Sequence, residues 1–270
     1  MIFHKKIGYM QGRLSNYKIN NLSVYPLNPY EEIETASNFN LSHIEFITKE
    51  QVGLDKNNLI WNDIEIKKVL KKNKSFNFRN ISFIDNRSVK KNILDLIKYY
   101  EKLIKQLKKA QFTILVIPLI EKSDLKKNNL KKFVTALDFI SNQCNKNKIN
   151  FCVETNASVM DFENLKNKMQ NKIGLVYDTG NRYLNNKKNY ISEIKLLGNN
   201  IKHVHLKDRN NKGKNVLLGN GNVNFKNIFK SLKEINYKGY FTIESTREKN
   251  AVSSLIKNRR YLYKCLKIIN

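Results

Sequence analysis

The 270-residue sequence contains little of what marks several large classes of protein. It has only three cysteines, Cys144, Cys152 and Cys265. Their number is odd and their spacing is not that of a cysteine metal motif, which argues against a disulfide framework and against a thiolate zinc site. A reducing compartment is the simplest location for such a chain, so we expect it to be cytoplasmic.

Long apolar runs and linker-like stretches are also absent from the sequence. No run reaches the roughly 18 to 20 apolar residues that a membrane span requires, so a membrane partner is excluded. The start, MIFHKKIGYM, lacks the apolar core of a signal peptide and is typical of a strand. With three prolines, ten glycines and no break in composition, the chain shows no linker, and we expect residues 1–270 to form one domain.

Acidic residues are few, 23 against 50 lysines and arginines, which leaves a formal charge of +27. Such a charge invites a nucleic-acid partner, because lysine and arginine neutralise phosphates. The lysines, however, are spread over most predicted helices, and asparagine is nearly as abundant as the basic residues. We therefore interpret the charge as a compositional drift tolerated on solvated helix faces, and we do not expect a nucleic-acid partner.

What is present is a regular alternation of short β-branched runs with longer lysine-rich segments of helical period. Strands are predicted at 5–11, 43–47, 78–84, 113–119, 149–155, 173–178, 201–207 and 240–245. Helices are predicted at 29–39, 88–110, 123–147, 224–236 and 251–269, among others. Eight units in 270 residues give about 34 residues each, the length of a strand, a helix and two connections. The pattern predicts an α/β fold, a single (β/α)8 barrel of TIM type.

A doubly wound parallel sheet is the alternative fold for the same alternation. The first strand-to-helix turn, MQGRLSN, has one glycine and cannot supply the G-x-G-x-x-G dinucleotide fingerprint. The later segment LGNGN, residues 218–222, has two glycines and lacks a third. Its interpretation stays open between a weak phosphate cradle and ordinary loop chemistry.

Ionisable residues stand at the ends of four consecutive predicted strands. They are Glu154, Asp178, His205 and Glu244, and they follow one another at 24, 27 and 39 residues. In a closed barrel the carboxyl ends of the strands converge, and barrel chemistry is built there. Two Glu, one Asp and one His form an oxygen-rich set suited to one divalent ion, Mn²⁺, Mg²⁺, Co²⁺ or Zn²⁺. Without an ion, the three carboxylates would raise one another's pKa by repulsion.

Two of the four histidines fall in one short segment, HVHLKDR at 203–209. Strand alternation places His203, His205 and Lys207 on one face, between apolar residues that indicate burial. A buried imidazole needs a partner, either a hydrogen-bonding neighbour or a metal ion. His4 and His43 lack matching partners in the sequence and are interpreted as structural.

In chain order, the segments IGYMQGRLS, HIEF, CVETN, VYDTGN, HVHLKDR, LGNGNVNF and FTIES resemble the xylose isomerase-like barrel superfamily of sugar phosphate isomerases and epimerases. The likeness is greatest to a bacterial branch that starts with IG-x-MQGRL, and it runs from about residue 7 to 247. It implies a TIM-type barrel with one divalent metal held by Glu154, Asp178, His205 and Glu244.

The same resemblance implies roles for individual residues. Glu154 and Glu244 would remove and return a proton next to a substrate carbonyl, through an enediolate. His203 would support the site or face the substrate. Relatives that epimerise free ketoses often have a histidine where this chain has Asn181. Many relatives also have a histidine where this chain has Ser82. Further substrate-binding candidates are Gln11, Arg13, Glu45, Lys207, Arg209 and Arg247; the two arginines Arg13 and Arg209 suit a phosphate or carboxylate.

The sequence therefore predicts a metal-dependent isomerase or epimerase of a small sugar or sugar phosphate. A cyclic polyol dehydratase of the same superfamily is an alternative, since it would begin with the same proton abstraction. A barrel that binds a ligand without catalysis is another. Endonuclease IV also belongs to the superfamily, but its histidine-rich three-metal site cannot be furnished by four histidines. Assembly into a homo-oligomer is left open.

Overall fold

The computed structural model describes residues 3–15, 29–47, 59–75, 79–85, 93–120 and 130–267. The predicted stretches 88–92, 123–129 and 268–269, residue 78 and the side chain of His4 lie outside this description. Among the described helices, none is both long and apolar enough to cross a membrane.

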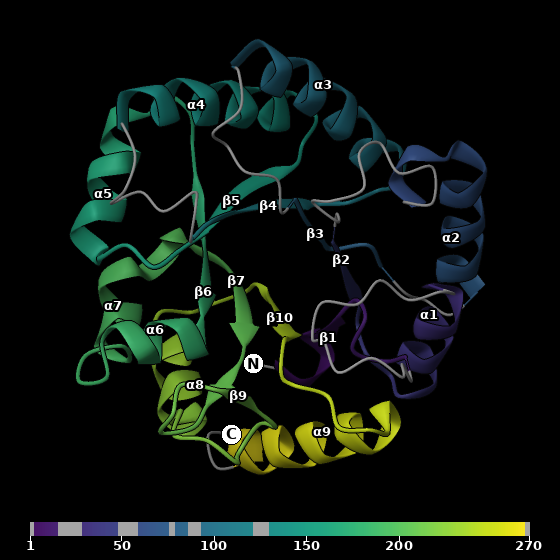
Figure 1. Cartoon of the computed structure of the whole chain (residues 1–270), viewed down its shortest axis with the longest axis vertical. Coiled ribbons are helices and arrows are strands. Elements are labelled where there is room, and N and C mark those ends of the chain that lie inside the picture. Colours follow the sequence, from purple (N-terminus) through teal and green to yellow (C-terminus); the bar gives the residue numbers. More distant parts are fainter. Residues whose placement is uncertain are drawn as a thin grey trace. The chain divides into compact units, whose positions relative to one another are not determined.

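Eight parallel strands follow the order β1-β10-β7-β6-β5-β4-β3-β2 of a closed barrel, and helices alternate with them along the chain (Figure 1). The strands are β1 (Ile7–Met10), β2 (Ile44–Ile47), β3 (Ser82–Ile84), β4 (Ile114–Leu119), β5 (Asn150–Thr155), β6 (Gly174–Asp178), β7 (Ile201–Leu206) and β10 (Tyr240–Ile243). The predicted α/β barrel is thereby confirmed. A small antiparallel pair, β8 (Asp208–Arg209) with β9 (Asn215–Val216), was not predicted.

Helices occupy the connections between the strands. They are α1 (Pro29–Asn38), α2 (Asp63–Ser75), α3 (Ile93–Lys109), α4 (Leu130–Lys146), α5 (Val159–Lys168), α6 (Thr179–Asn185), α7 (Ser192–Leu197), α8 (Phe225–Glu234) and α9 (Ala251–Lys267). Short 3-10 turns, η1 (Phe3–Lys6), η2 (Leu59–Trp61) and η5 (Gly198–Asn200), complete the described elements. The prediction that strand one includes residues 5 and 6 was wrong, because both belong to η1.

The chain divides into two compact units, residues 1–44 with 177–270 (unit 1) and residues 45–176 (unit 2). Unit 1 contains the neighbouring strands β1, β10 and β7, joined in parallel register. Its core includes a cluster in which the ring of Phe241 lies 5.2 Å from that of Phe3 and 5.6 Å from that of Phe229. Gly8 has no side chain, and a Cβ there would lie 2.4 Å from the His43 ring, so glycine lets β1 approach that histidine.

Unit 2 is organised around β4, which is flanked by β3 and β5. All six residues of β4 pair with β5, from Ile114 with Asn150 to Leu119 with Thr155. Helices α3 and α4 pack against each other beside these strands (Figure 1). Leu103 and Leu107 are fully buried, as expected of an amphipathic helix whose apolar stripe covers a sheet.

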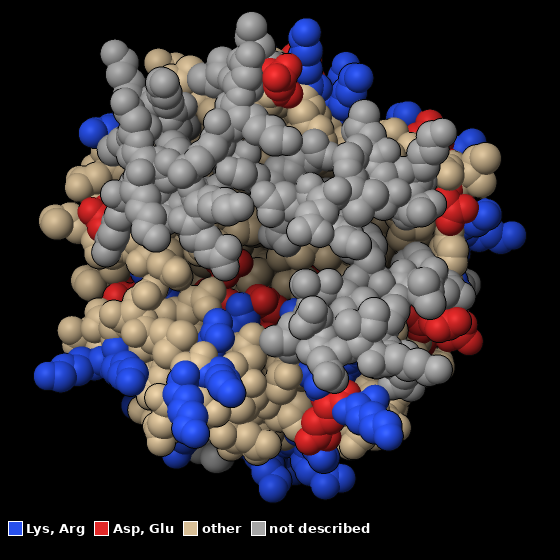
Figure 2. Space-filling model, in the orientation of Figure 1, with Lys and Arg blue, Asp and Glu red and all other residues tan. Residues whose placement is uncertain are grey.

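Basic side chains are dispersed over the described surface. On the face drawn in Figure 2, lysines and arginines stand at several separate places, both near the edge and farther in, among the atoms shown in colour. Helices of both units carry them, for example Lys102 in α3 and Lys257 in α9. This arrangement differs from the clustered face of a nucleic-acid-binding surface.

Candidate active site at the carboxyl ends of the unit 1 strands

Unit 1 brings three of the four predicted metal ligands together. Asp178 is the last residue of β6, His205 lies in β7, and Glu244 directly follows β10. One ligand atom from each of the three lies within 4.8 Å of the others. Asp178 and His205 are buried, and the Glu244 side chain is 17% exposed.

The strand register explains this convergence. Thr242 of β10 pairs with His205 of β7, so Glu244 follows two residues beyond the histidine's partner. The Glu244 N–H donates to the carbonyl of Leu206 at 3.0 Å, which extends the pairing past the end of β10. Asp178 caps α6, and its Oδ1 accepts from the N–H of Asn181 at 2.7 Å. Each ligand is thus held by backbone contacts near a strand end.

Lys207 lies between two of these carboxylates. Its Nζ is 2.7 Å from Asp178 Oδ2 and 2.7 Å from Glu244 Oε1. His205 Nδ1 is 3.2 Å from the other Glu244 oxygen. Burial by itself would raise the pKa of Glu244, but the Lys207 ammonium and the His205 imidazole hold that pKa well below its usual range. Lys207, which was predicted to contact substrate, therefore pairs with two carboxylates of the site and keeps Glu244 ionised.

His203 and His43 share one hydroxyl group. Their Nε2 atoms lie 2.9 and 3.0 Å from Thr242 Oγ1, and Ser42 Oγ is 2.7 Å from His43 Nδ1. Both imidazoles are fully buried. The His203 ring stands edge-on to the His205 ring, with centroids 5.4 Å apart. His203 therefore packs behind the proposed ligand, and His43 has the hydrogen-bonded, buried place expected of a structural histidine.

Glu154 and Glu45 belong to unit 2. Glu154 is the fifth residue of β5 and is 6% exposed. In the β5–β6 register it pairs with Val176, two residues before Asp178 in β6. Glu45 is the second residue of β2 and is fully buried. We predicted Glu154 at the carboxyl end of its strand, and it lies there; Glu45 was predicted only as a substrate contact.

The remaining candidates lie in the loops after the strands. Gln11 and Arg13 follow β1 and are 4% and 8% exposed. Arg209 donates to the Gly213 carbonyl at 3.1 Å and to Asn181 Oδ1 at 2.8 Å. Asn181, which departs from the ketose epimerases, is thus tied to an arginine of the β8–β9 pair.

The glycine-containing segment surrounds the carboxylate of Asp208. The backbone N–H groups of Gly219 and Gly221 donate to Oδ2 at 2.9 and 3.0 Å, and those of Arg209 and Val223 to Oδ1 at 2.9 and 3.1 Å. A Cβ on Gly221 would lie 2.2 Å from Oδ1, so glycine permits the close approach. The phosphate-cradle interpretation loses its support, because these amides already bind an internal anion.

Helix α1 contains a buried carboxylate that was not predicted from the sequence. Glu32 is 1% exposed and accepts from the N–H groups of Gly12 and Leu14, both at 2.9 Å, and from Ser15 Oγ at 2.8 Å. Burial raises the pKa of Glu32 above its usual value, and these donors offset only part of that rise. The motif PYEEIE has two adjacent glutamates, and helical period alone could have suggested that only one of them faces inward.

A comparison with family sequence models identifies residues 33–265 as a xylose isomerase-like TIM barrel. The chain belongs to this family. Because the matched region starts at residue 33, the branch suggested by IG-x-MQGRL stays a prediction. Among curated proteins, no sequence matches the chain closely enough to count as a relative.

Solved structures of this barrel type align with almost the whole chain. D-psicose 3-epimerase from Clostridium cellulolyticum H10, solved with D-tagatose, has a TM-score of 0.74 at 14% identity, covering 98% of this chain and 99% of that one. The IolI protein, solved with a zinc atom, has a TM-score of 0.75 at 14% identity and covers 98% and 99%. The 3-keto-D-glucoside 4-epimerase from E. coli has a TM-score of 0.72 at 15% identity and covers 97% and 99%. At these identities the likeness establishes the fold.

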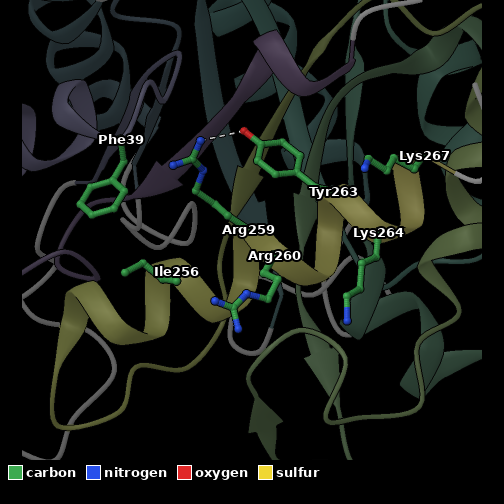
Figure 3. Close-up of a pocket in the computed structure, with 7 residues that line it drawn as sticks. All are labelled: Phe39, Ile256, Arg259, Arg260, Tyr263, Lys264 and Lys267. Carbon is green, nitrogen blue, oxygen red and sulfur yellow. Dashed lines mark hydrogen bonds between the residues drawn. The ribbon is translucent and has the colours of Figure 1, made fainter.

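A hollow lies beside α9 in unit 1. Figure 3 shows this hollow of about 500 Å³ between α9 and the end of α1, lined by Phe39, Ile256, Arg259, Arg260, Tyr263, Lys264 and Lys267. Arg259 lies over the Phe39 ring at 5.9 Å and donates to the Tyr263 hydroxyl at 2.7 Å. None of the predicted site residues lines it.

Proposed function

We propose that the chain is a divalent-metal-dependent isomerase or epimerase of a small sugar or sugar phosphate. The observation that carries the proposal is the cluster of Asp178, His205 and Glu244, whose ligand atoms lie within 4.8 Å of one another. Two carboxylates and one imidazole are a donor set suited to Mn²⁺, Mg²⁺, Co²⁺ or Zn²⁺. Solved structures of the same fold include several sugar 3-epimerases and a zinc-containing protein, which supports this reading.

Glu154 is the proposed fourth ligand. Its strand, β5, is the direct neighbour of β6, and it pairs two residues before Asp178. A glutamate at this position would add a third carboxylate, and the cation would relieve the repulsion among the three. When bound, a divalent ion would polarise the substrate's carbonyl and so make the neighbouring C–H bond more acidic.

The proposed proton transfer uses two carboxylates. Lys207 and His205 hold the pKa of Glu244 below its usual range, so the carboxylate is ionised and able to accept a proton, and the same lowering makes it a weaker base. For one configuration of the substrate, Glu244 would take the proton from the carbon and become the neutral acid, and Glu154, protonated beforehand on the other side of that carbon, would give up its own proton there. Which of the two removes the proton depends on the stereochemistry of the substrate. Gln11, Arg13, Glu45, Lys207, Arg209 and Arg247 remain proposed contacts of a small-molecule substrate, and His203 is proposed to support the site or face the substrate.

The test replaces each proposed catalytic carboxylate by its amide. Glu154→Gln and Glu244→Gln keep an oxygen donor but lose the proton acceptor. We expect each to slow solvent deuterium incorporation into a ketose or aldose, free or phosphorylated, by about 100-fold or more. Elemental analysis of each variant separates a lost base from a lost metal ion. Unchanged turnover by a variant that retains its metal would contradict the mechanism.

Glu248→Gln is the matched control. Glu248 lies four residues after Glu244 and is 43% exposed, with Lys257 Nζ at 2.7 Å. It should leave exchange unchanged. Product mass distinguishes the two enzyme alternatives, since a polyol dehydratase would begin with the same abstraction but lose water. A protein that binds a sugar without exchanging any hydrogen would favour the non-catalytic barrel.

A further inference from the structure

The loop after β1 buries an arginine. Arg13 is only 8% exposed, although an arginine in a loop is ordinarily solvated. Its backbone N–H donates to the Met10 carbonyl at 3.3 Å, and Gly12 beside it has φ +81°, a value that favours glycine. The loop thus turns back sharply and carries the guanidinium inward.

Glu32 holds this loop in place. Its carboxylate oxygens accept the N–H groups of Gly12 and Leu14, on either side of Arg13, and the Ser15 hydroxyl. Charge-assisted bonds of this kind are stronger than neutral ones and fix the backbone. Glu32 is therefore occupied in shaping the loop, and the arginine is presented by a rigid frame.

A second guanidinium reaches the same loop. Arg247 follows β10 by four residues, is partly buried, and its Nη1 donates to the Ser15 carbonyl. Because β1 and β10 are neighbouring strands of unit 1, the two arginines come from adjacent strand ends. Burial lowers the pKa of Arg13, Glu244 and Glu32 raise it, and the charge of Arg247 lowers it again. Two like charges at one loop repel each other, and an anion bound beside them would relieve that repulsion.

The Nε of Arg13 is a second indication that an anion binds at this loop. It is shielded from solvent, and among the described residues it has no hydrogen-bond acceptor. A buried N–H group without an acceptor costs about 1–3 kcal/mol, so such groups are rare in folded proteins unless a ligand uses them. The Nε and Nη edge of a guanidinium matches the two oxygens of a phosphate or carboxylate.

We propose that Arg13 and Arg247 bind an oxyanion on the substrate, a phosphate ester or a carboxylate, so that the chain acts on an acidic sugar. This inference rests on the proposed function, because it places the anion beside Glu244, the proposed proton-transfer group. Arg247 lies three residues beyond Glu244 in the chain, so an anion held by the arginine pair is within a small molecule's length of that carboxylate. The pair would therefore select a substrate with its charge at one end and its reacting carbon at the other.

The first experiment measures solvent deuterium incorporation into three matched sets of compounds: ketose phosphates, the same ketoses without phosphate, and keto-sugar acids. We expect exchange in one of the two acidic sets, with a lower KM than for the neutral ketoses. Arg13→Gln should raise the KM for the acidic substrate about 10- to 100-fold, the worth of a charged hydrogen bond, and change kcat little. Arg13→Lys should recover part of the loss, because it restores charge without the paired donors.

A binding measurement avoids dependence on turnover. Calorimetric titration with a pentitol phosphate, with a pentonate and with the free pentitol should show binding of at least one of the two anions and not of the free pentitol, and Arg13→Gln and Arg247→Gln should each weaken that binding. Arg260→Gln is the control, because Arg260 is an exposed arginine that lines the separate hollow in Figure 3. Circular dichroism and thermal unfolding establish that each variant is folded.

The outcomes separate this inference from the proposed function. If neutral ketoses exchange as well as acidic ones and Arg13→Gln affects both equally, the oxyanion site is wrong while the isomerase stands. If the pentitol phosphate binds through Arg13 but no compound of any set exchanges, the proposed function fails. If phosphate esters and acids both fail to bind, the arginine pair serves only to neutralise Glu244 and Glu32.

Discussion

Single residues of the site differ in how readily the sequence reveals them. Asp178 and Glu244 could be found because each ends an apolar run, and strand ends meet in a barrel. Lys207 was found as a residue on the same face as His205, but its partners were not, because both carboxylates come from other strands. The alternation of residues predicts the face of the strand on which a side chain lies, but its contacts with other strands are known only from the folded structure.

Lys207→Met tests whether this ammonium balances the charge of the site. The Lys207 side chain is 6% exposed and pairs with two carboxylates. In the presence of a chelator we expect the variant to lose about 3 kcal/mol or more of unfolding free energy, because buried carboxylates are left unpaired. Added Mn²⁺ should stabilise the variant more than the wild type, since the ion supplies the missing charge. Denaturant unfolding with and without metal measures both effects.

Lys195→Met is the matched control for that variant. Lys195 Nζ lies 2.8 Å from Glu234, but the lysine side chain is 61% exposed. Removing such a surface pair costs about 0–1 kcal/mol, with or without metal. A Lys207 variant that is as stable as the wild type in chelator would show that the buried ammonium is not required for charge balance.

At the scale of elements, the strand and helix pattern was predictable for all eight barrel strands. Their burial makes each one a short β-branched run, and the connections are too polar to be confused with them. What could not be predicted is local. The pair β8–β9 has two residues in each strand, and α7 has six, too few for a period to show. Asp208 was visible as a charged residue after β7, but its four backbone donors are made by the fold of residues 209–223.

Asp208→Asn should loosen the segment from Leu217 to Val223. The carboxylate accepts hydrogen bonds from four backbone N–H groups. In asparagine an NH2 group replaces one of the two oxygens, and because it is itself a donor it cannot accept the N–H groups that it would face. We expect a loss of about 2–3 kcal/mol of unfolding free energy. Hydrogen exchange followed by mass spectrometry should show lost protection at this segment.

A second aspartate, Asp138 in unit 2, provides the control. Asp138 accepts the backbone N–H groups of Gln170 and Asn171, both at 2.9 Å through Oδ1, at a more exposed place. Asp138→Asn should affect protection at residues 170–171 and leave residues 217–223 as they are. Full protection of the glycine-containing segment in Asp208→Asn would mean that loop packing, rather than the carboxylate, holds it.

For the whole molecule, the charge of +27 is a property to be explained apart from the site. The site needs only a few charged groups, and about half of the lysines lie in the described helices. A net charge so far from zero opposes the compact state through self-repulsion. If the charge is a compositional drift and no bound polyanion neutralises it, the basic side chains repel one another in the folded chain. The stability of the fold should then depend on how strongly dissolved salt screens that repulsion.

We therefore expect thermal stability to rise with NaCl. The Debye screening length falls from about 30 Å at 0.01 M salt to about 8 Å at 0.15 M, so the repulsion between distant lysines weakens over this range. Calorimetric melting should show a higher Tm at 0.15 M than at 0.01 M.

A triple variant, Lys102→Gln, Lys105→Gln and Lys108→Gln on the exposed face of α3, lowers the net charge from +27 to +24 at nearly equal helix propensity. It should melt higher than the wild type at 0.01 M and match it at 0.5 M. A Tm that falls as salt is added would instead show that surface ion pairs outweigh the repulsion.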